Sequence, residues 1–286
     1  MMKYYVVDAF TSEAFGGNPA GVVLLEHGAA FPDDRLMVQI AAELRYSETA
    51  FVRQDGPKEF TVRYFTPCSE VDLCGHATIA TFGVLRQEGL VASDALCLNH
   101  TLAGDLQVRT GVPVMMQMAP PQVIDKTIDF NHLHEVMAGD AAVGWTSMPV
   151  RIVSTGLPDI IMPVDGVDAL NALQPDMVAL AALSKELEVT GVHAFAMADD
   201  GYTAHVRNFA PLYGIPEESA TGTANAALTH YLHLQGLVFQ QAECRFEQGE
   251  QMDRRSVVTT LIDAVGGVWV GGNSCIIARG ELVVGE

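Results

Sequence analysis

The chain has 286 residues, 49% of them apolar, and its 16 Lys and Arg oppose 35 Asp and Glu to give a formal net charge of −19. This length suits one large or two medium domains. The acidic balance argues against nucleic acid and anionic membranes as partners, because both require a basic surface. No apolar run reaches the roughly 18 residues of a membrane-spanning helix.

A cytoplasmic location is expected from two further features. Asp8 interrupts the apolar start of the chain, which argues against a signal peptide. The cysteines are odd in number and scattered, which is typical of reduced thiols rather than of a disulfide framework. They are Cys68, Cys74, Cys97, Cys244 and Cys275.

The first elements follow from hydrophobic periodicity and turn residues. Two strands around a Gly-Gly-Asn-Pro turn at residues 16–19 suggest a hairpin. Residues 32–45 begin with Pro and two acids and carry apolar residues at four-residue spacing, which predicts an amphipathic helix. The strands expected up to residue 65 are 3–10, 20–26, 47–52 and 59–65.

Residues 62–90, VRYFTPCSEVDLCGHATIATFGVLRQEGL, predict a strand, a short loop and a helix. From residue 77 to residue 85 only two small threonines are polar, and a helix without a polar face is buried all round. The N–H groups of its first turn, at residues 74–76, would therefore point into the protein. A bound anion is one natural partner for them.

The same pattern recurs at residues 206–237, VRNFAPLYGIPEESATGTANAALTHYLHLQGL. Val, Arg, Phe and Pro match 144 residues later, and Gly, Ala and Leu landmarks of the helix match 147 residues later. The shift is about half the chain length, which indicates a duplicated half. In the second half we expect strands at 150–155, 193–197, 202–209, 243–247, 256–262, 267–271 and 274–284, and helices at about 175–188 and 221–235.

The predicted class is α+β, with two pseudo-symmetric domains that are each a curled, mostly antiparallel, β-barrel-like sheet around a central apolar helix. Strands in residues 94–118 complete the first domain, and the Ala-Pro-Pro-Gln break at 119–122 is the expected linker. The domains are thus 1–118, with the last strand at about 274–286 as a possible addition, and 119–286. Sites commonly form at such domain interfaces.

Differences between the halves point to chemistry. At the 144-residue shift, Glu48 corresponds to Val192. Glu48 is therefore a candidate general base, since a partly buried carboxylate accepts a proton from carbon more readily. The alternative is a solvated glutamate at a strand edge.

At the helix starts, His76 corresponds to Thr223. Both are candidates for substrate binding or proton relay, and both could instead cap their own helices. Glu217 and Glu218 precede the second helix and could interact with its dipole. Glu218 is also a candidate second acid/base facing Glu48.

Other motifs favour plainer interpretations. Cys74-x-His76 is too isolated for a zinc site, which needs three or four ligands. The histidine pairs at 132/134 and 230/233 are typical of loop and helix surfaces, and the Gly-Gly-Asn-Pro turn lacks the residues of a P-loop. No cofactor motif and no metal site is found in the sequence.

Four stretches in this order and spacing resemble the phenazine-biosynthesis PhzF family, which is related in fold to diaminopimelate epimerase and proline racemase. They are FGGNPAGVV, SETAFV, FTPCSEVDLCGHATIAT and ATGTANAALTHYL. The resemblance covers nearly the whole chain. It implies two barrel-like domains with the active site in the cleft between them, a homodimer, and cofactor-independent proton transfer at carbon, as in isomerisation of a dihydro-hydroxyanthranilate.

By the same resemblance, the family's general acid/base Glu falls on Glu48 and its Gly-His histidine on His76. The Asp and Ser of its EDPATGS motif fall on Glu218 and Thr223, where this chain reads EESATGT. The longer acid and the added methyl would reshape the substrate end of the cleft. The relatives that use two thiols would place one near Cys74, but the second helix start has no cysteine.

The sequence thus predicts an isomerase or epimerase that moves a proton on a small, amino- or hydroxy-acid-like carboxylic acid. Glu48, His76 and Glu218 are the candidate catalytic residues. The candidate substrate-binding residues are Asn18, Gly75, Ala77, Gly222 and Thr223. Two alternatives stay open, namely a non-catalytic anion-binding or protein-interaction module and a thiol-based racemase that depends on Cys74.

Overall fold

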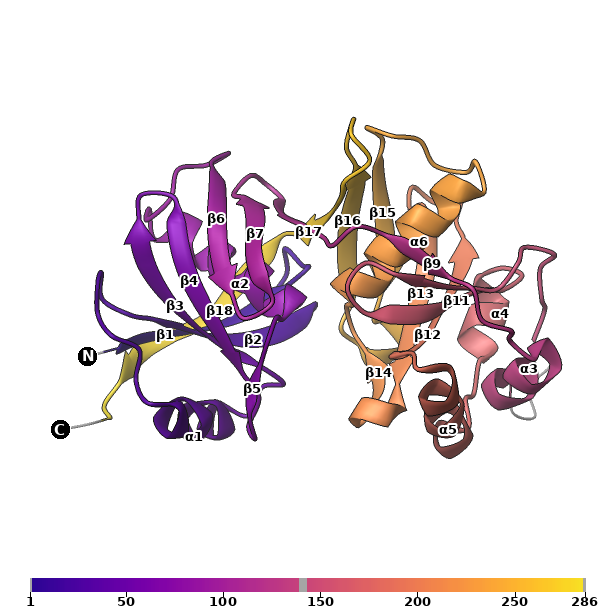
Figure 1. Cartoon of the computed structure of the whole chain (residues 1–286), viewed down its shortest axis with the longest axis horizontal. Helices are drawn as coiled ribbons and strands as arrows, with labels where there is room; N and C mark the ends of the chain where they lie inside the picture. The colour runs from indigo at the N-terminus through magenta and orange to yellow at the C-terminus, as the bar shows by residue number, and fades with distance from the viewer. Residues whose placement is uncertain (1, 139–142, 285–286) are drawn as a thin grey trace. The chain divides into compact units, whose positions relative to one another are not determined.

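The computed structural model describes residues 2–138 and 143–284, and the chain divides into two compact units. Unit 1 consists of Met1–Gln117 and Gly271–Glu286, and unit 2 consists of Met118–Val270 (Figure 1). Both units combine β-sheet with a few helices, so the class is α+β. Within the described residues, no helix has the length and apolar character needed to cross a membrane.

Unit 1 holds one set of strands and two helices. The strands are β1 (Met2–Ala9), β2 (Asn18–Leu24), β3 (Thr49–Gly56), β4 (Glu59–Phe65), β5 (Glu70–Val71), β6 (Leu96–Thr101), β7 (Gly104–Arg109), β8 (Val114–Gln117) and β18 (Ser274–Leu282). The helices are α1 (Asp34–Leu44) and α2 (Gly75–Gln87). The boundary between the units falls inside β17 (Val268–Gly272).

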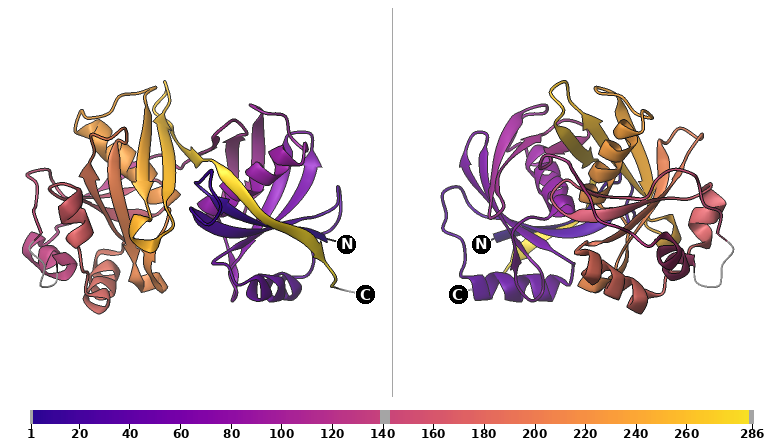
Figure 2. Two further views of the ribbon diagram at one scale, coloured as in Figure 1. Left: turned by 180° about the vertical axis from the view of Figure 1, so that it is seen from behind. Right: turned by 45° about the vertical axis from the view of Figure 1, so that its right-hand side comes forward.

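The sheet of unit 1 runs in the spatial order β18, β1, β2, β3, β4, β6, β7, β8. Neighbours are antiparallel except β2 with β3 and β4 with β6. Figure 2 shows the last strand, β18, alongside β1, and their register runs from Met2 opposite Leu282 to Ala9 opposite Ser274. A strand from the end of the chain therefore completes the sheet that its first residues begin.

Helix α2 is the core of unit 1. Every residue from His76 to Leu85 is buried, and the helix packs against β1, β2, β3, β8 and β18. This agrees with a sequence that gives it no polar face. By contrast, α1 is amphipathic and buries Met37, Ile40 and Ala41, and its N-cap Asp33 accepts a hydrogen bond from the Leu36 N–H.

Unit 2 has more helices than unit 1. Its strands are β9 (Gln122–Ile124), β10 (Arg151–Ser154), β11 (Pro158–Pro163), β12 (Gly191–Met197), β13 (Ala204–Ala210), β14 (Ile215–Glu218), β15 (Glu243–Gln248) and β16 (Ser256–Ile262). Its helices are α3 (Phe130–Ala138), α4 (Val167–Ala172), α5 (Met177–Leu187) and α6 (Gly222–Leu234), with short 3₁₀ turns at Pro211–Tyr213 and Glu250–Met252.

The two units repeat one plan. Strands β9, β10, β11, β12, β13, β15 and β16 lie in that spatial order, with β11 parallel to β12 and β13 parallel to β15. Helix α6 has the same 13-residue length as α2 and packs against β10, β11, β12 and β16. Helices α1 and α5 both have an Asp N-cap and end at a residue in the left-handed conformation, Arg45 and Glu188.

The expected order of strands and long helices is present apart from β11, a six-residue strand that is not among the expected strands, and the other differences are short elements. Strands β5, β9 and β14 have two to four residues, so alternation along them is too brief to detect. Helices α3 and α4 were also not predicted, and the 132/134 histidine pair lies on α3 rather than in a loop. Residues 285 and 286 of the expected last strand lie outside the described residues.

Candidate active site

The sequence pattern predicts Glu48 inside a strand, but the residue lies one position before the start of β3. Its backbone carbonyl accepts a hydrogen bond of 3.1 Å from the Gly21 N–H of β2, which holds the residue against the sheet. A side chain at Gly21 would meet Thr49 Oγ1 at 2.6 Å, so this close approach requires glycine. The Glu48 carboxylate is therefore positioned by the backbone of the sheet on one side and by α2 on the other.

Glu48 and His76 are brought together. Glu48 Oε2 lies 3.3 Å from His76 Nε2, and the Glu48 side chain keeps 20% of its exposure against 7% for the imidazole. Ser47 Oγ lies 3.4 Å from the same nitrogen, and Cys74 Sγ lies 3.4 Å from His76 Nδ1. A buried imidazole is thus flanked by a thiol and a carboxylate that reaches toward solvent, which contradicts the picture of Glu48 as a fully solvated glutamate.

His76 is neutral in this setting. Burial lowers the pKa of the imidazole, and the nearby Glu48 charge opposes that effect only in part. A neutral ring has one N–H donor and one acceptor nitrogen. The distances fit a ring that donates from Nε2 to Glu48 and accepts at Nδ1 from the Cys74 thiol.

The first turn of α2 offers backbone donors. Its N-cap is Cys74, whose side chain makes no capping hydrogen bond, and His76 does not cap the helix either. The N–H groups of Gly75, His76 and Ala77 have no hydrogen-bond acceptor among the described residues. Together with the helix dipole, they form an electropositive end beside the Glu48–His76 pair.

Asn18 is buried at the start of β2, opposite Ala9 of β1. Its position depends on Gly17, which has a φ of +62° and whose missing Cβ would lie 2.1 Å from the Ala9 carbonyl oxygen. Only glycine fits that turn. Asn18 thus belongs to unit 1, like Glu48 and His76.

Strand register corrects the match between the halves. Thr49 pairs with Phe65 in unit 1, and Val192 pairs with the equivalent Phe209 in unit 2. Val192 therefore corresponds to Thr49, and Glu48 corresponds to Gly191. A constant 144-residue shift fails here because the turn between β12 and β13 is longer than the turn between β3 and β4. The conclusion that one half has an acid where the other has none still holds.

Glu217 and Glu218 lie in β14, a short strand that the sequence pattern does not predict, and they differ in role. Arg207 donates to both carboxylate oxygens of Glu217 at 2.9 Å, as Arg63 does to Glu70 in unit 1. Glu217 therefore forms a duplicated structural ion pair rather than serving the α6 dipole.

Glu218 is the acid that unit 2 has added. It pairs with Asn208 as Val71 pairs with Tyr64 in unit 1. Its Oε2 accepts a 2.6 Å hydrogen bond from Thr221 Oγ1. Gln248 Nε2 donates to the Glu218 carbonyl at 2.8 Å and to Thr221 Oγ1 at 3.0 Å. Glu218 is thus held by a polar network at the start of α6.

Thr223 is not the cap of α6, which corrects one alternative drawn from the sequence. The N-cap is Thr221, and the Thr223 carbonyl accepts a 2.9 Å hydrogen bond from Thr155 Oγ1. The N–H groups of Gly222, Thr223 and Ala224 have no acceptor among the described residues, as at the start of α2.

Sequence reasoning missed Asp159, although an acid inside the apolar run PDIIMP is a visible signal. It is 1% exposed, and its Oδ1 has no hydrogen-bond partner among the described residues. Burial and the Glu218 charge raise the pKa of Asp159 to about 7, against a smaller opposing effect of the Gly191 N–H. Asp159 is the parallel-strand partner of Gly191, so unit 2 holds a carboxyl beside the position equivalent to Glu48.

Nearby, His193 is buried between two amides. Asn208 Nδ2 donates to its Nδ1 at 3.2 Å, and its Nε2 lies 3.4 Å from Asn225 Oδ1. Burial lowers the pKa of His193 to about 3, so the ring stays neutral. It orders the polar interior of unit 2 rather than carrying charge.

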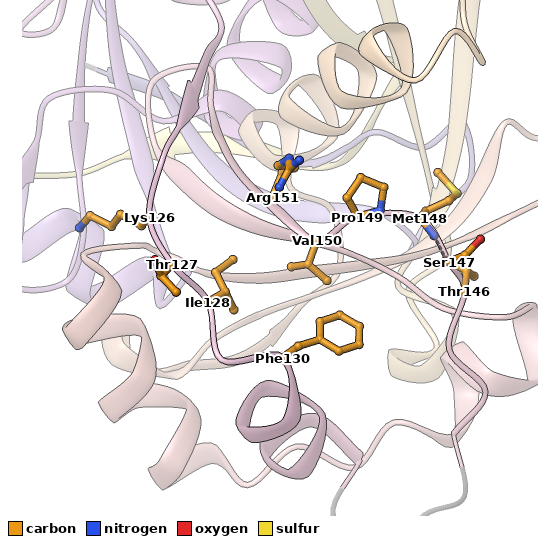
Figure 3. A pocket seen from close by; sticks show the side chains of 10 residues that line it. All are labelled: Lys126, Thr127, Ile128, Phe130, Thr146, Ser147, Met148, Pro149, Val150 and Arg151. Carbon is orange, nitrogen blue, oxygen red and sulfur yellow. Dashed lines mark hydrogen bonds between the residues drawn. The ribbon is translucent and has the colours of Figure 1, made fainter.

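A hollow of about 490 Å³ lies elsewhere in unit 2 (Figure 3). Its side chains come from the segment before and into α3 and from the segment that leads into β10. None of the candidate residues lines it. The other histidine pairs also stand apart: His134 stacks on Trp145, and His233 on α6 contacts the Val238 carbonyl.

Comparison with known proteins identifies the family. The family model for the phenazine biosynthesis-like protein, PhzC-PhzF, matches residues 7–280. An uncharacterized isomerase of Deinococcus radiodurans is 37% identical over 244 residues, which make up 82% of this chain and 78% of that protein. The chain therefore belongs to the phenazine biosynthesis-like PhzC-PhzF family.

Solved structures agree on the fold. A PhzF-family phenazine biosynthesis protein of Bacillus anthracis is 27% identical, with a TM-score of 0.86 over 99% of this chain and 100% of that one. A hydroxyproline epimerase from Agrobacterium vitis, 14% identical, has a TM-score of 0.64 over 98% of this chain and 90% of that one. The second likeness shows the fold alone. It agrees with the expected relation of the fold to proline racemase-like proteins.

Proposed function

We propose that this protein is a cofactor-independent isomerase that moves a proton between two positions on a small carboxylic acid, with Glu48 as the base. The observation that carries the proposal is the pairing of Glu48 with His76 at 3.3 Å, beside the N-terminus of α2. Its relatives' names, which include an uncharacterized isomerase, support the reaction class.

Glu48 removes a proton from carbon and returns it to another carbon or to the opposite face. The negative charge left on the substrate is spread toward its carboxylate. In this proposal the N–H groups of Gly75 and Ala77 hold that carboxylate, and the positive end of α2 stabilises the developing charge. Asn18 completes the contacts from unit 1.

Neutral His76 has a supporting role. Its Nε2–H orients Glu48, and its low pKa keeps it from holding the carboxylate in a permanent ion pair that would weaken the base. It can pass a proton once the carboxylate has taken one. Because the Glu48 side chain remains partly exposed, the proton that it has taken can exchange with solvent before a proton is returned to the substrate.

We further propose that Glu218 and Thr223 of unit 2 act in the same reaction, Glu218 as a second acid/base and Thr223 with Gly222 as substrate-binding groups. Glu218 is supported by its place opposite Asn208, where unit 1 has an apolar residue. Since glutamate and threonine replace the aspartate and serine expected from the family motif, we expect a substrate shaped differently at this end from a dihydro-hydroxyanthranilate.

The test is exchange of carbon-bound hydrogen with solvent. The protein is incubated in heavy water with a panel of small amino and hydroxy acids, and NMR follows loss of the C–H signal. We expect exchange into at least one acid. Glu48→Gln should bind the same acid and slow exchange by about 10²- to 10⁴-fold, the usual contribution of a general base.

Glu43→Gln is the matched control, because Glu43 is an exposed glutamate on α1 in the same unit. It should exchange at the wild-type rate. An unchanged rate in Glu48→Gln would remove Glu48 as the base. Binding without exchange across the panel would favour a non-catalytic anion-binding protein.

A further inference from the structure

We propose that Glu48, Cys74 and His76 form a zinc site that inhibits the enzyme when it is occupied. The three side chains supply a carboxylate, a thiolate and an imidazole, the ligand types that Zn²⁺ binds in proteins. One ligand atom from each lies within 4.8 Å of the others. In sequence, Cys74-x-His76 lacks a third ligand, and the fold supplies it from the segment before β3.

The distances fit tetrahedral coordination. Zinc bonds of about 2.3 Å to sulfur and about 2.0 Å to nitrogen or oxygen place ligand atoms about 3.3–3.6 Å apart. An ion bound at His76 Nε2 would lie between Glu48 Oε2, which is 3.3 Å from that nitrogen, and Cys74 Sγ, which is 3.8 Å from it. Small side-chain rotations would therefore seat an ion, with the fourth position left for water or a substrate carboxylate.

The surroundings also favour a metal ligand set. His76 is buried and contacted on both ring nitrogens, so its imidazole is already held within the cluster. Cys74 is the N-cap of α2, so the positive end of the helix lies beside this ligand. Glu48 keeps part of its side chain exposed, which gives an ion a path into an otherwise buried cluster.

A second cluster in unit 2, Asp200, His205 and Glu247, has three ligand atoms of two types, carboxylate and imidazole, within the same span, but its side chains already bind one another and Arg255. His205 is held by carboxylates on both ring nitrogens, at 2.9 Å from Asp200 and 2.7 Å from Glu247. Arg255 contacts the other oxygen of Glu247. These contacts occupy both ring nitrogens of His205 and both carboxylate oxygens of Glu247, so we place the zinc site in unit 1.

Binding is measured with Co²⁺ as a spectroscopic substitute for Zn²⁺, on the reduced full-length protein without substrate. The wild type should show a thiolate-to-cobalt charge-transfer band, which Zn²⁺ removes by displacement. Cys74→Ser should lose the band and bind Zn²⁺ more than about 100-fold more weakly, beyond the 10- to 100-fold loss typical of a residue that only supports a ligand. Glu48→Gln should keep the band and weaken binding.

Cys68→Ser is the matched control, since Cys68 is exposed and lies six residues before Cys74. It should bind Co²⁺ like the wild type. Absence of the band in the wild type, or a band that survives Cys74→Ser in a protein with unchanged circular dichroism, would overturn the zinc site.

Inhibition rests on the proposed function, whereas binding does not. If exchange activity is found, Zn²⁺ should suppress it in the wild type at the concentration that displaces Co²⁺, and a chelator should restore it. A protein that binds zinc but never exchanges hydrogen would contradict only the proposed isomerase. Activity that persists with the site occupied would contradict only the inhibition.

Discussion

At the residue scale, one buried carboxyl should make the stability of unit 2 depend on pH. The pKa of Asp159 is raised from 3.8 to about 7 in the folded state. Between those values the unfolded chain has released a proton that the native protein still holds, so the free energy of unfolding falls as pH rises through this window. Above about pH 7 both states have lost the proton, and the native state bears the whole free-energy cost of ionising the buried Asp159.

Asp159→Asn removes the ionisation and keeps the shape. It should raise the free energy of unfolding by about 1 kcal/mol or more at pH 8, and the gain should shrink toward pH 4. Thermal unfolding at both pH values measures this. Asp199→Asn is the control, because Asp199 is exposed. An equal effect of Asp159→Asn at pH 4 and pH 8 would mean that Asp159 does not hold its proton as described.

Residue types were easier to predict than their registers. Glu48 is a candidate because an acid in one half has no counterpart in the other. The structure keeps that contrast, but the residue equivalent to Glu48 is Gly191 rather than Val192. Because the two halves match only at a few residues, a one-residue difference in the turn between those residues cannot be detected from the repeat. Glu217 and Glu218 looked alike in sequence, and only their strand pairing separates an ion-pair partner from a candidate acid.

At the scale of elements, the long helices were predictable and the short strands were not. An unbroken apolar run predicts helix α2, whereas the four residues of β14 are too few for an alternating pattern to distinguish a strand from a loop. Failure to predict β14 affects the candidate site, because this strand carries Glu218. The sequence could not show whether the N–H groups at each helix start have acceptors, because such hydrogen bonds depend on chain segments distant in sequence.

Gly75→Ala tests the N-terminus of α2. A Cβ at Gly75 would lie 3.8 Å from its nearest neighbour, Met116 Cε, so the fold should accept the methyl with a stability change within about 1 kcal/mol. If a substrate carboxylate rests on this turn, the methyl crowds it. The loss of one hydrogen bond to a charged group, about 1.5–3 kcal/mol, should weaken binding by about 10- to 100-fold.

Titration calorimetry with an acid found in the exchange panel measures that affinity, and thermal unfolding checks the fold. Thr101→Ala in β6 is the control, because it leaves α2 untouched and should not change binding. Gly104→Ala is unsuitable, because the φ of Gly104 is positive and a side chain there is strained. Wild-type affinity in a folded Gly75→Ala protein would place the carboxylate elsewhere.

At the scale of the whole molecule, the duplication explains how the chain uses its ends. The place beside β10 in unit 2 is taken by β9, which follows unit 1 in sequence, and the equivalent place beside β1 in unit 1 is taken by β18, which follows unit 2. A compositional break could indicate where the chain leaves unit 1, but strand pairing over such a sequence distance leaves no local pattern. The last strand is therefore where the stability of unit 1 can be tested separately.

The double substitution Ala278→Pro/Arg279→Pro should destabilise unit 1. These residues pair with Val6 and Tyr5 of β1, and neighbouring N–H groups in a strand point to opposite edges, so one of the two prolines removes a donor to β1. The expected cost is about 1–3 kcal/mol, the cost of leaving one buried backbone acceptor without its partner. Hydrogen exchange followed by mass spectrometry should show faster exchange in β1 and the rest of unit 1, with β12 and β13 unchanged. Ala278→Ser/Arg279→Ser retains the N–H groups and should exchange like the wild type. A parallel increase throughout unit 2 would show that the two units unfold as one.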